Sequence, residues 1–393
     1  MQICLTVIEG PHQGQAFPFG GHDTFVVGRS KHAHFRLPHK DKYFSRIHFL
    51  MEVNPPRCRV VDMGSRNGTY VNGKKILSAD LKDGDLITAG RSVLRIAVVP
   101  EADDDTKPQV QPRGGRSLTA VAKPVQGYQT VMELGRGGMG VVYLANRESD
   151  NAVVALKVIV PAVAASPREL ERFVQAAGVL RMLDHPSIVK CFDVGESNGR
   201  LFVAMEHVDG MDTAQIVKQK GPLPIRPAVE IMCEVLAALE FAHARRLVHR
   251  DIKPSNVLVA KAGGVKVADF GLAKLYQASQ LSGLTMTGNL GGSAGFMPPE
   301  LITRYGEAKP AADQYAVAAT LYYLLTGKTA HDVPRKTHLH FAKVLHDEPV
   351  PLRQRRPEVS EALAKLVHQG LARERVERFR NVKEFRLALS KTL

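Results

Sequence analysis

The sequence predicts two folded domains, an all-β domain over residues 1–99 and a larger domain of strands and helices over 128–393. The chain has 393 residues, of which 44% are hydrophobic, enough for two or three packed cores. Short strand-like runs separated by Asn-Gly and Asp-Gly pairs in the first hundred residues are typical of an all-β domain. Between the two domains, apolar periodicity is lost while proline, glycine and charges recur, which predicts a flexible linker over 100–127.

Three polar loop motifs are spaced along the first domain. Gly28-Arg29-Ser30 follows the apolar run Thr24–Val27, Ser45-Arg46-Ile47-His48 comes next, and the segment Asp62–Gly73 contains Arg66-Asn67-Gly68. A phosphate dianion needs positive charge and several hydrogen-bond donors that converge from loops. The three motifs contain both kinds of group.

This arrangement resembles the forkhead-associated (FHA) domain, a β-sandwich that binds phosphothreonine peptides. The resemblance implies that Arg29, Ser45 and Arg46 bind the phosphate and that Asn67 holds the peptide backbone. Arg66 is expected to add positive charge.

Other residues of these loops have structural interpretations. We expect Gly28 to be required by a turn and His48 to brace the loop. His32, His34 and His39 crowd one loop, but no cysteine or carboxylate pattern completes a metal site, which favours solvated histidines.

Seven motifs follow one another in the second domain. They are Leu134–Val142, which is rich in glycine, Val154-Ala155-Leu156-Lys157, Met205–Val208, His249–Asn256, Asp269-Phe270-Gly271, Pro298-Pro299-Glu300 and Asp313-Gln314-Tyr315. A single glycine-rich motif is weak evidence, whereas linked motifs in this order are strong evidence. This part of the chain, from about Tyr128 to Leu393, closely resembles the eukaryotic-like serine/threonine kinases of bacteria, which implies a bilobal α+β fold.

Phosphoryl transfer depends on positioning and charge neutralisation, and the motifs supply residues for both. Gly135, Gly137 and Gly140 lack Cβ atoms, so backbone amides can lie close over the phosphates of ATP. Lys157 is expected to pair with the α- and β-phosphates.

The catalytic and metal-binding residues come from two later motifs. Asp251 is expected to accept or orient the substrate hydroxyl proton, and Lys253 to reach the γ-phosphate as a point charge. Asn256 and Asp269 are expected to supply the oxygen ligands that magnesium prefers, with manganese as an alternative metal. In the family, a lysine two residues after the catalytic aspartate indicates specificity for Ser and Thr.

The resemblance also implies an adenine pocket and two braces. Met205 would be the gatekeeper, with backbone contacts to adenine from Glu206 and Val208. Four apolar residues would sandwich the base: Leu134, Val142, Ala155 and Leu258. Glu300 would pair with Arg378, and Asp313 would hold the catalytic loop from a buried helix.

The segment Leu272–Ala294 contains candidates for autophosphorylation. Thr285 and Thr287 are the main ones, because Arg250 precedes the catalytic aspartate and an arginine there commonly docks a loop phosphate. Ser282 is a weaker candidate, and Ser293 is better interpreted as a substrate-pocket residue.

The sequence departs from the family at one position. A helix glutamate nine residues before the histidine of His185–Val189 would normally pair with Lys157, but Ala176 stands there. Glu169 lies about two helical turns upstream, on the order of 10 Å away, too far for a simple exchange of roles; Glu171 is the other nearby acid. The alternative function is therefore a pseudokinase or weakly active scaffold that docks phosphorylated partners.

Composition narrows the remaining choices. The net charge of +14 is spread along the chain without a basic tail, so we expect protein partners and no nucleic acid. The four cysteines show no paired spacing: Cys4, Cys58, Cys191 and Cys233. No signal peptide is recognised. The longest apolar run, Ala316–Leu325, is too short for a membrane span. We expect a cytoplasmic protein.

The preferred interpretation is thus an ATP- and magnesium-dependent serine/threonine kinase with an N-terminal phosphothreonine-binding domain. Its expected partners are protein substrates and phosphothreonine proteins, including itself in cis or in trans. A pure phosphopeptide adaptor would explain only the first domain.

Overall fold

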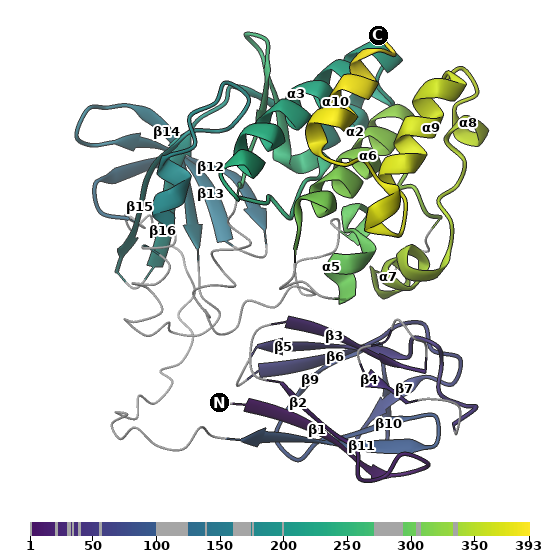
Figure 1. The fold of residues 1–393 in the computed structure, drawn as a ribbon. Coiled ribbons are helices and arrows are strands. Elements are labelled where there is room, and N and C mark those ends of the chain that lie inside the picture. Colours follow the sequence, from purple (N-terminus) through teal and green to yellow (C-terminus); the bar gives the residue numbers. More distant parts are fainter. Residues whose placement is uncertain are drawn as a thin grey trace.

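The computed structural model of the chain has an N-terminal β-sandwich and a larger domain of two lobes (Figure 1). It describes residues 2–19, 23–29, 33, 35–37, 41–54, 57–99, 125–137, 140–159, 174, 177–198, 200–270, 294–303, 308–332 and 337–393.

Two sheets form the N-terminal sandwich. The first has the strand order β2-β1-β11-β10-β7-β8, and the second the order β4-β3-β5-β6-β9. The strands are β1 (Gln2–Glu9), β2 (Ala16–Phe19), β3 (Asp23–Gly28), β4 (Phe35–Arg36), β5 (Phe49–Asn54), β6 (Arg57–Asp62), β7 (Thr69–Val71), β8 (Lys74–Ile76), β9 (Ser78–Leu81), β10 (Leu86–Ala89) and β11 (Ser92–Val99).

Alternate residues of both sheets meet in one core between them. Leu5, Val7 and Ile96 of the first sheet and Phe49 and Met51 of the second are all fully buried there. The period of two along each strand produces this inward set.

The smaller lobe of the second domain is a five-stranded antiparallel sheet in the order β12-β13-β14-β16-β15. Its strands are β12 (Tyr128–Gly137), β13 (Gly140–Arg147), β14 (Val153–Ile159), β15 (Cys191–Ser197) and β16 (Arg200–Glu206). Val125, which the sequence assigns to the linker, is fully buried against this sheet beside Tyr128.

The larger lobe is helical, with a small sheet of three strands beside the first lobe. Its helices are α2 (Thr213–Lys220), α3 (Ile225–Ala244), α5 (Pro299–Thr303), α6 (Pro310–Thr326), α7 (Thr337–His346), α8 (Leu352–Arg355), α9 (Glu361–Gly370) and α10 (Val382–Ser390). The small sheet consists of β17 (Gly210–Asp212), β18 (Val257–Ala260) and β19 (Val265–Val267), and short 3-10 turns lie at Pro254–Asn256, Ala294–Phe296 and Arg375–Glu377.

Helix α6 forms the centre of this lobe, and nearly every residue from Ala312 to Leu325 is buried. Burial on all sides explains why the sequence here is apolar without helical periodicity. Among the described residues, no helix combines the length and apolar character needed to cross a bilayer.

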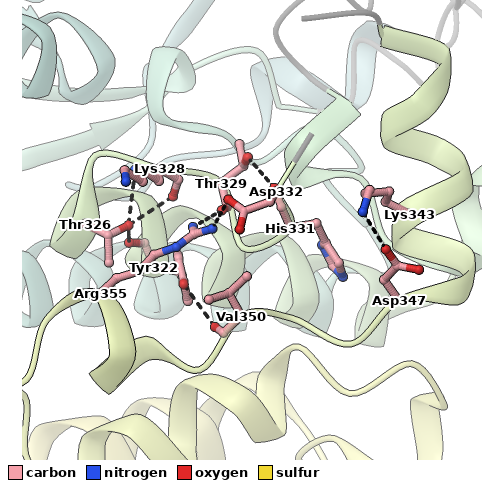
Figure 2. A network of polar contacts seen from close by, with 10 residues as sticks. All are labelled: Tyr322, Thr326, Lys328, Thr329, His331, Asp332, Lys343, Asp347, Val350 and Arg355. Atoms are coloured by element: carbon pink, nitrogen blue, oxygen red, sulfur yellow. Dashed lines mark hydrogen bonds and ion pairs between the residues drawn. The ribbon is translucent and has the colours of Figure 1, made fainter. Parts of the chain in front are cut away.

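A polar network fixes the end of α6 to the chain around α8 (Figure 2). The Tyr322 hydroxyl donates to the carbonyl oxygen of Val350 over 3.0 Å. The Arg355 guanidinium donates to the carbonyl oxygen of Thr329 over 2.5 Å and pairs with Asp332. These contacts join α6 and the turn that follows it to residues 350–355.

Candidate catalytic and phosphopeptide sites

Three predicted residues of the catalytic loop form one hydrogen-bonded group after α3. The Lys253 ammonium lies 2.7 Å from Asp251 Oδ2. Asn256 donates through Nδ2 to the Asp251 backbone oxygen over 2.8 Å and to its carboxylate over 3.1 Å. The Asp251 carboxylate is therefore held in place by groups that leave it partly exposed.

Asp313 braces this loop from the first turn of α6, as predicted. Its buried carboxylate accepts hydrogen bonds from the backbone N–H groups of His249 and Arg250, both over 2.9 Å, and contacts His243 Nε2 at 2.7 Å. Burial alone would raise the pKa of Asp313, but the hydrogen bond from His243 and the charges of His243 and His249 outweigh it and lower that pKa below its usual range.

The predicted pair between Glu300 and Arg378 is also present. Two guanidinium nitrogens of Arg378 lie 2.6 and 2.9 Å from the two carboxylate oxygens of Glu300. This bidentate pair fixes α5 to the chain just before α10.

Lys157 on β14 contacts Asp269 directly, with Nζ 2.7 Å from Oδ2. Burial tends to raise the pKa of Asp269, but the charge and hydrogen bond of Lys157, together with the nearby charges of Lys253 and His249, lower it overall. The sequence predicted both residues at the site but not this contact, because it joins positions 112 residues apart across the two lobes.

The predicted adenine-binding residues surround the junction of the lobes. Ala155 of β14 pairs with Met205 of β16, and Val142, Val208 and Leu258 pack against the same apolar cluster. The Glu206 carboxylate accepts a hydrogen bond from Lys266 Nζ over 2.9 Å. Leu134 of β12 is 42% exposed.

Behind Met205 lies a small, mainly apolar pocket with a volume of about 30 Å³. It is lined by Leu180, Leu183, Val189, Cys191, Val203, Met205, Asp269 and Phe270. Phe270 packs edge-on against His249 with ring centroids 4.5 Å apart, which links the pocket to the catalytic loop.

The glycines of the glycine-rich hairpin have different surroundings. A Cβ on Gly140 would lie 2.1 Å from the backbone oxygen of Val158, so close strand approach requires glycine there. Apart from its chain neighbours, no described residue has an atom within 4 Å of a Cβ built on Gly135. Gly137 ends β12, opposite Gly140.

Several predicted residues lie outside the described part of the chain, and their roles remain predictions. They are Ser30, His32, His34, His39, Glu169, Glu171, Ala176, Ser282, Thr285, Thr287 and Ser293.

The described loop residues of the sandwich gather at the end of β3. The Arg29 backbone N–H donates to the Ser45 carbonyl oxygen over 3.2 Å, and the Arg66 backbone N–H donates to Ser45 Oγ over 3.0 Å. Asn67 Nδ2 donates to the Tyr43 carbonyl oxygen over 2.7 Å. Within the described residues, the buried Nε of Arg29 has no hydrogen-bond partner.

His48 braces this edge, as predicted from the sequence. Its Nδ1 accepts from the Ser45 backbone N–H over 3.0 Å, and its Nε2 lies 3.2 Å from the Gly68 carbonyl oxygen. Burial lowers the pKa of His48, which suits a neutral ring that accepts on one nitrogen and donates on the other.

Gly28 is required by close packing rather than by a turn. A Cβ at this position would lie 2.2 Å from the carbonyl oxygen of Arg46. The glycine therefore lets the loop that carries Ser45 and Arg46 lie directly against β3.

Two buried carboxylates that the sequence analysis missed also shape the edge. Asp62 accepts from the backbone N–H groups of Gly64 and Ser65 and from the hydroxyl of Thr69. Asp41 accepts from the backbone N–H of Arg91 over 2.6 Å. The sequence signal for Asp62 was an aspartate before a Gly-Ser turn. Asp41 gave no such signal, because its hydrogen bond joins segments far apart in the sequence.

A sheet lobe and a helical lobe that bring together Asp251, Lys253, Asn256, Asp269 and Lys157 define the protein kinase class. The chain belongs to this family: residues 128–385 match the family model of the protein kinase domain, and residues 25–90 match that of the FHA domain. The fold class predicted from the sequence is therefore confirmed.

Similar proteins include bacterial serine/threonine kinases. PknD of Mycobacterium tuberculosis is 37% identical over 261 residues, which cover 66% of this chain and 39% of PknD. The probable kinase PknB of Lactococcus lactis is 36% identical over 262 residues, which cover 65% of this chain and 40% of PknB. The matched part thus spans about two fifths of these relatives.

Solved structures show the same folds. The PknI kinase domain of Mycobacterium tuberculosis, at 32% identity, covers 70% of this chain with a TM-score of 0.55. A Rad53 structure in complex with AMP-PNP covers 98% of this chain, also with a TM-score of 0.55, and at 20% identity it indicates the fold alone.

Proposed function

We propose that the chain transfers the γ-phosphoryl group of ATP to Ser or Thr hydroxyls of proteins. The observation that carries this proposal is the group formed by Asp251, Lys253 and Asn256. Asp251 accepts the hydroxyl proton as the hydroxyl oxygen attacks, and Lys253 offsets charge on the γ-phosphate. Lys253 also supports Ser/Thr specificity.

The donor set fits a magnesium ion brought with ATP. Asn256 uses its Nδ2 on Asp251, so its amide oxygen is the atom suited to a cation, and Asp269 supplies a carboxylate with a lowered pKa. Magnesium prefers few protein ligands beside water and phosphate oxygens, and when bound it neutralises phosphate charge. Across the described residues, no cluster of three or more metal-ligating side chains competes for it.

The test is phosphate incorporation from radiolabelled ATP into a Ser/Thr protein substrate. Asp251→Asn and Asp269→Asn should each remove most of the activity, while thermal unfolding shows that the variants fold. Asp184→Asn serves as a matched control, because that side chain is 81% exposed. Full activity of either site variant would refute the assignment.

The N-terminal domain is proposed to bind phosphothreonine peptides at the edge formed by Arg29, Ser45, Arg46, Arg66 and Asn67. The buried, unpartnered Nε of Arg29 supports an anion there. Titration with phosphothreonine, phosphoserine and unmodified peptides should give binding of the first only. Arg29→Ala and Ser45→Ala should abolish it, and unchanged affinity would place the site elsewhere.

We also propose that the kinase phosphorylates itself at Thr285, Thr287 or both. A phosphate on this segment could form charge-assisted hydrogen bonds with Arg250. Mass spectrometry after incubation with ATP and magnesium should find the modification in the parent and not in Asp251→Asn. A bare segment in an active parent would contradict it.

The comparisons do not support the scaffold alternative, since the matched relatives carry kinase names. Incubation of the parent chain with radiolabelled ATP and a protein substrate distinguishes a kinase from a scaffold, because only a kinase transfers phosphate to the substrate.

A further inference from the structure

The outer face of the second FHA sheet carries a row of apolar side chains. Val26 of β3 pairs with Leu50 of β5, and Leu50 pairs with Val61 of β6, so the three lie side by side on neighbouring strands. None of them is more than 5% exposed. The outward positions of a β-sandwich are normally polar, so this row is unusual.

The same strands are also apolar on their inner face. Val27, Phe49 and Val60, which alternate with the outer row, belong to the core of the sandwich. Strands that are apolar on both faces are typical of sheets covered on both sides. The sequence of β3, β5 and β6 therefore calls for a second layer outside the sandwich.

In the structure this second layer is the helical lobe. The outer row belongs to one continuous apolar cluster with the core of that lobe, and the cluster includes Ile302 of α5, which is 2% exposed. Helix α5 contacts β3 directly, and Figure 1 shows it facing the sheet of β3, β5 and β6.

The covered face continues into the phosphopeptide edge. Ile47, which is 5% exposed in the same cluster, directly follows Arg46. Met63, also buried there, donates its backbone N–H to the His48 carbonyl oxygen and stands just before the turn held by Asp62. On the kinase side, α5 begins directly after Pro298, at the end of the segment that follows the Asp-Phe-Gly motif.

We propose that the row of Val26, Leu50 and Val61 is an intramolecular docking surface for α5 of the same chain. Docking holds the phosphopeptide edge beside the end of the kinase activation segment. Because one chain joins the two parts, a small apolar interface suffices, since the tether supplies a high effective concentration.

The test is hydrogen exchange measured by mass spectrometry on the full chain. Leu50→Glu and Val61→Glu place a charge in the interface and should accelerate amide exchange at residues 299–303 by about tenfold or more. Leu77→Glu is the matched control, because Leu77 lies in the same domain with 52% of its surface exposed, and it should leave exchange unchanged.

Folding of the variants is checked by thermal unfolding and far-ultraviolet circular dichroism. If a glutamate variant fails to fold, Val26→Thr keeps a β-branched residue at the strand position and should give a smaller acceleration at the same residues. Unchanged exchange at 299–303 in folded variants would overturn the proposal.

A second measurement separates docking within one chain from docking between two. Light scattering after size exclusion should give a monomer for both the parent and Leu50→Glu. A parent dimer that Leu50→Glu converts to a monomer would mean that α5 of a second copy occupies the surface, which contradicts the proposal. None of these measurements requires kinase activity, so their outcome is independent of the proposed reaction.

Discussion

At the scale of residues, the ion pair between Lys157 and Asp269 places opposite charges where phosphate and metal are expected. Lys157 is 7% exposed, and its ammonium group pairs with this carboxylate in the described structure. ATP and a metal ion would supply new partners to both groups. Binding of nucleotide and metal would therefore exchange the pair of Lys157 and Asp269 for pairs with phosphate and metal.

Asp313 gives a prediction about stability and pH. Asp313→Asn should lower the free energy of unfolding of the kinase domain by about 2 kcal/mol at neutral pH, because a buried, charged acceptor of several hydrogen bonds is lost. Since the folded pKa of Asp313 is lowered, its contribution is complete above about pH 4 and is lost as the pH falls through the folded pKa.

Urea denaturation of both proteins at neutral pH and near pH 3 checks this prediction. The difference between parent and variant should narrow at the lower pH. Asp184→Asn should change stability by less than about 0.5 kcal/mol at both values. A difference that grows in acid would contradict the assignment.

Sequence reasoning identified the braces for which the family resemblance supplied a pattern. These are His48, Asp313 and the pair of Glu300 and Arg378, and the last two join positions more than 60 residues apart. The contact of Lys157 with Asp269 depends on how the lobes close, which no spacing along the chain specifies.

At the scale of elements, the helix that ends at Arg181 carries the departure from the family pattern. Leu180 and Leu183 bury its end against the lobe junction, and both line the pocket behind Met205. The charge that would tie this helix to Lys157 is missing from position 176 in the sequence. In the described part of the helix, its contacts are this apolar packing and an ion pair of Arg181 with Asp193 at 3.8 Å.

Ala176→Glu is predicted to raise kcat several-fold, because a carboxylate there would orient Lys157 over the phosphates. Ala176→Gln is the matched control; it has similar size without charge and should leave kcat near the parent value. No gain from glutamate, combined with loss of activity in Glu171→Ala or Glu169→Ala, would mean that another acid has taken over the role.

The strands of the FHA sheet show what element-level patterns can predict. Short strands and tight turns were sufficient to predict an all-β domain, and the family resemblance predicted that it is a sandwich. The doubled apolar faces of β5 and β6 were also visible in the sequence, in Phe49-Leu50-Met51 and Val60-Val61. Their partner could not be predicted, because the pattern indicates that a face is covered without indicating what covers it.

At the scale of the whole molecule, the docking surface and the phosphopeptide edge are neighbours in the sequence as well as in space. Arg46 belongs to the phosphopeptide edge, and Ile47 belongs to the apolar cluster that contains the docking surface. Binding free energy at one site can therefore shift the equilibrium at the other, and linkage makes the effect reciprocal.

A phosphothreonine peptide is predicted to slow hydrogen exchange at residues 299–303 of the full chain, because holding Arg46 on phosphate also fixes Ile47 against the helical lobe. Exchange with and without peptide is the measurement. Arg29→Ala should remove the effect by preventing binding, and Leu50→Glu should remove it while binding persists. If the peptide still slows hydrogen exchange at residues 299–303 in Leu50→Glu, the effect of the peptide does not pass through the docking surface.

The outer row of Val26, Leu50 and Val61 also affects how the domains can be handled separately. An FHA domain cut from the chain would present these side chains to water as one patch, and exposed patches of this kind promote aggregation. Production of the isolated domain should therefore benefit from polar replacements in this row. The same replacements would be harmful in the intact protein, so solubility of the fragment and integrity of the whole chain place opposite demands on the same three residues.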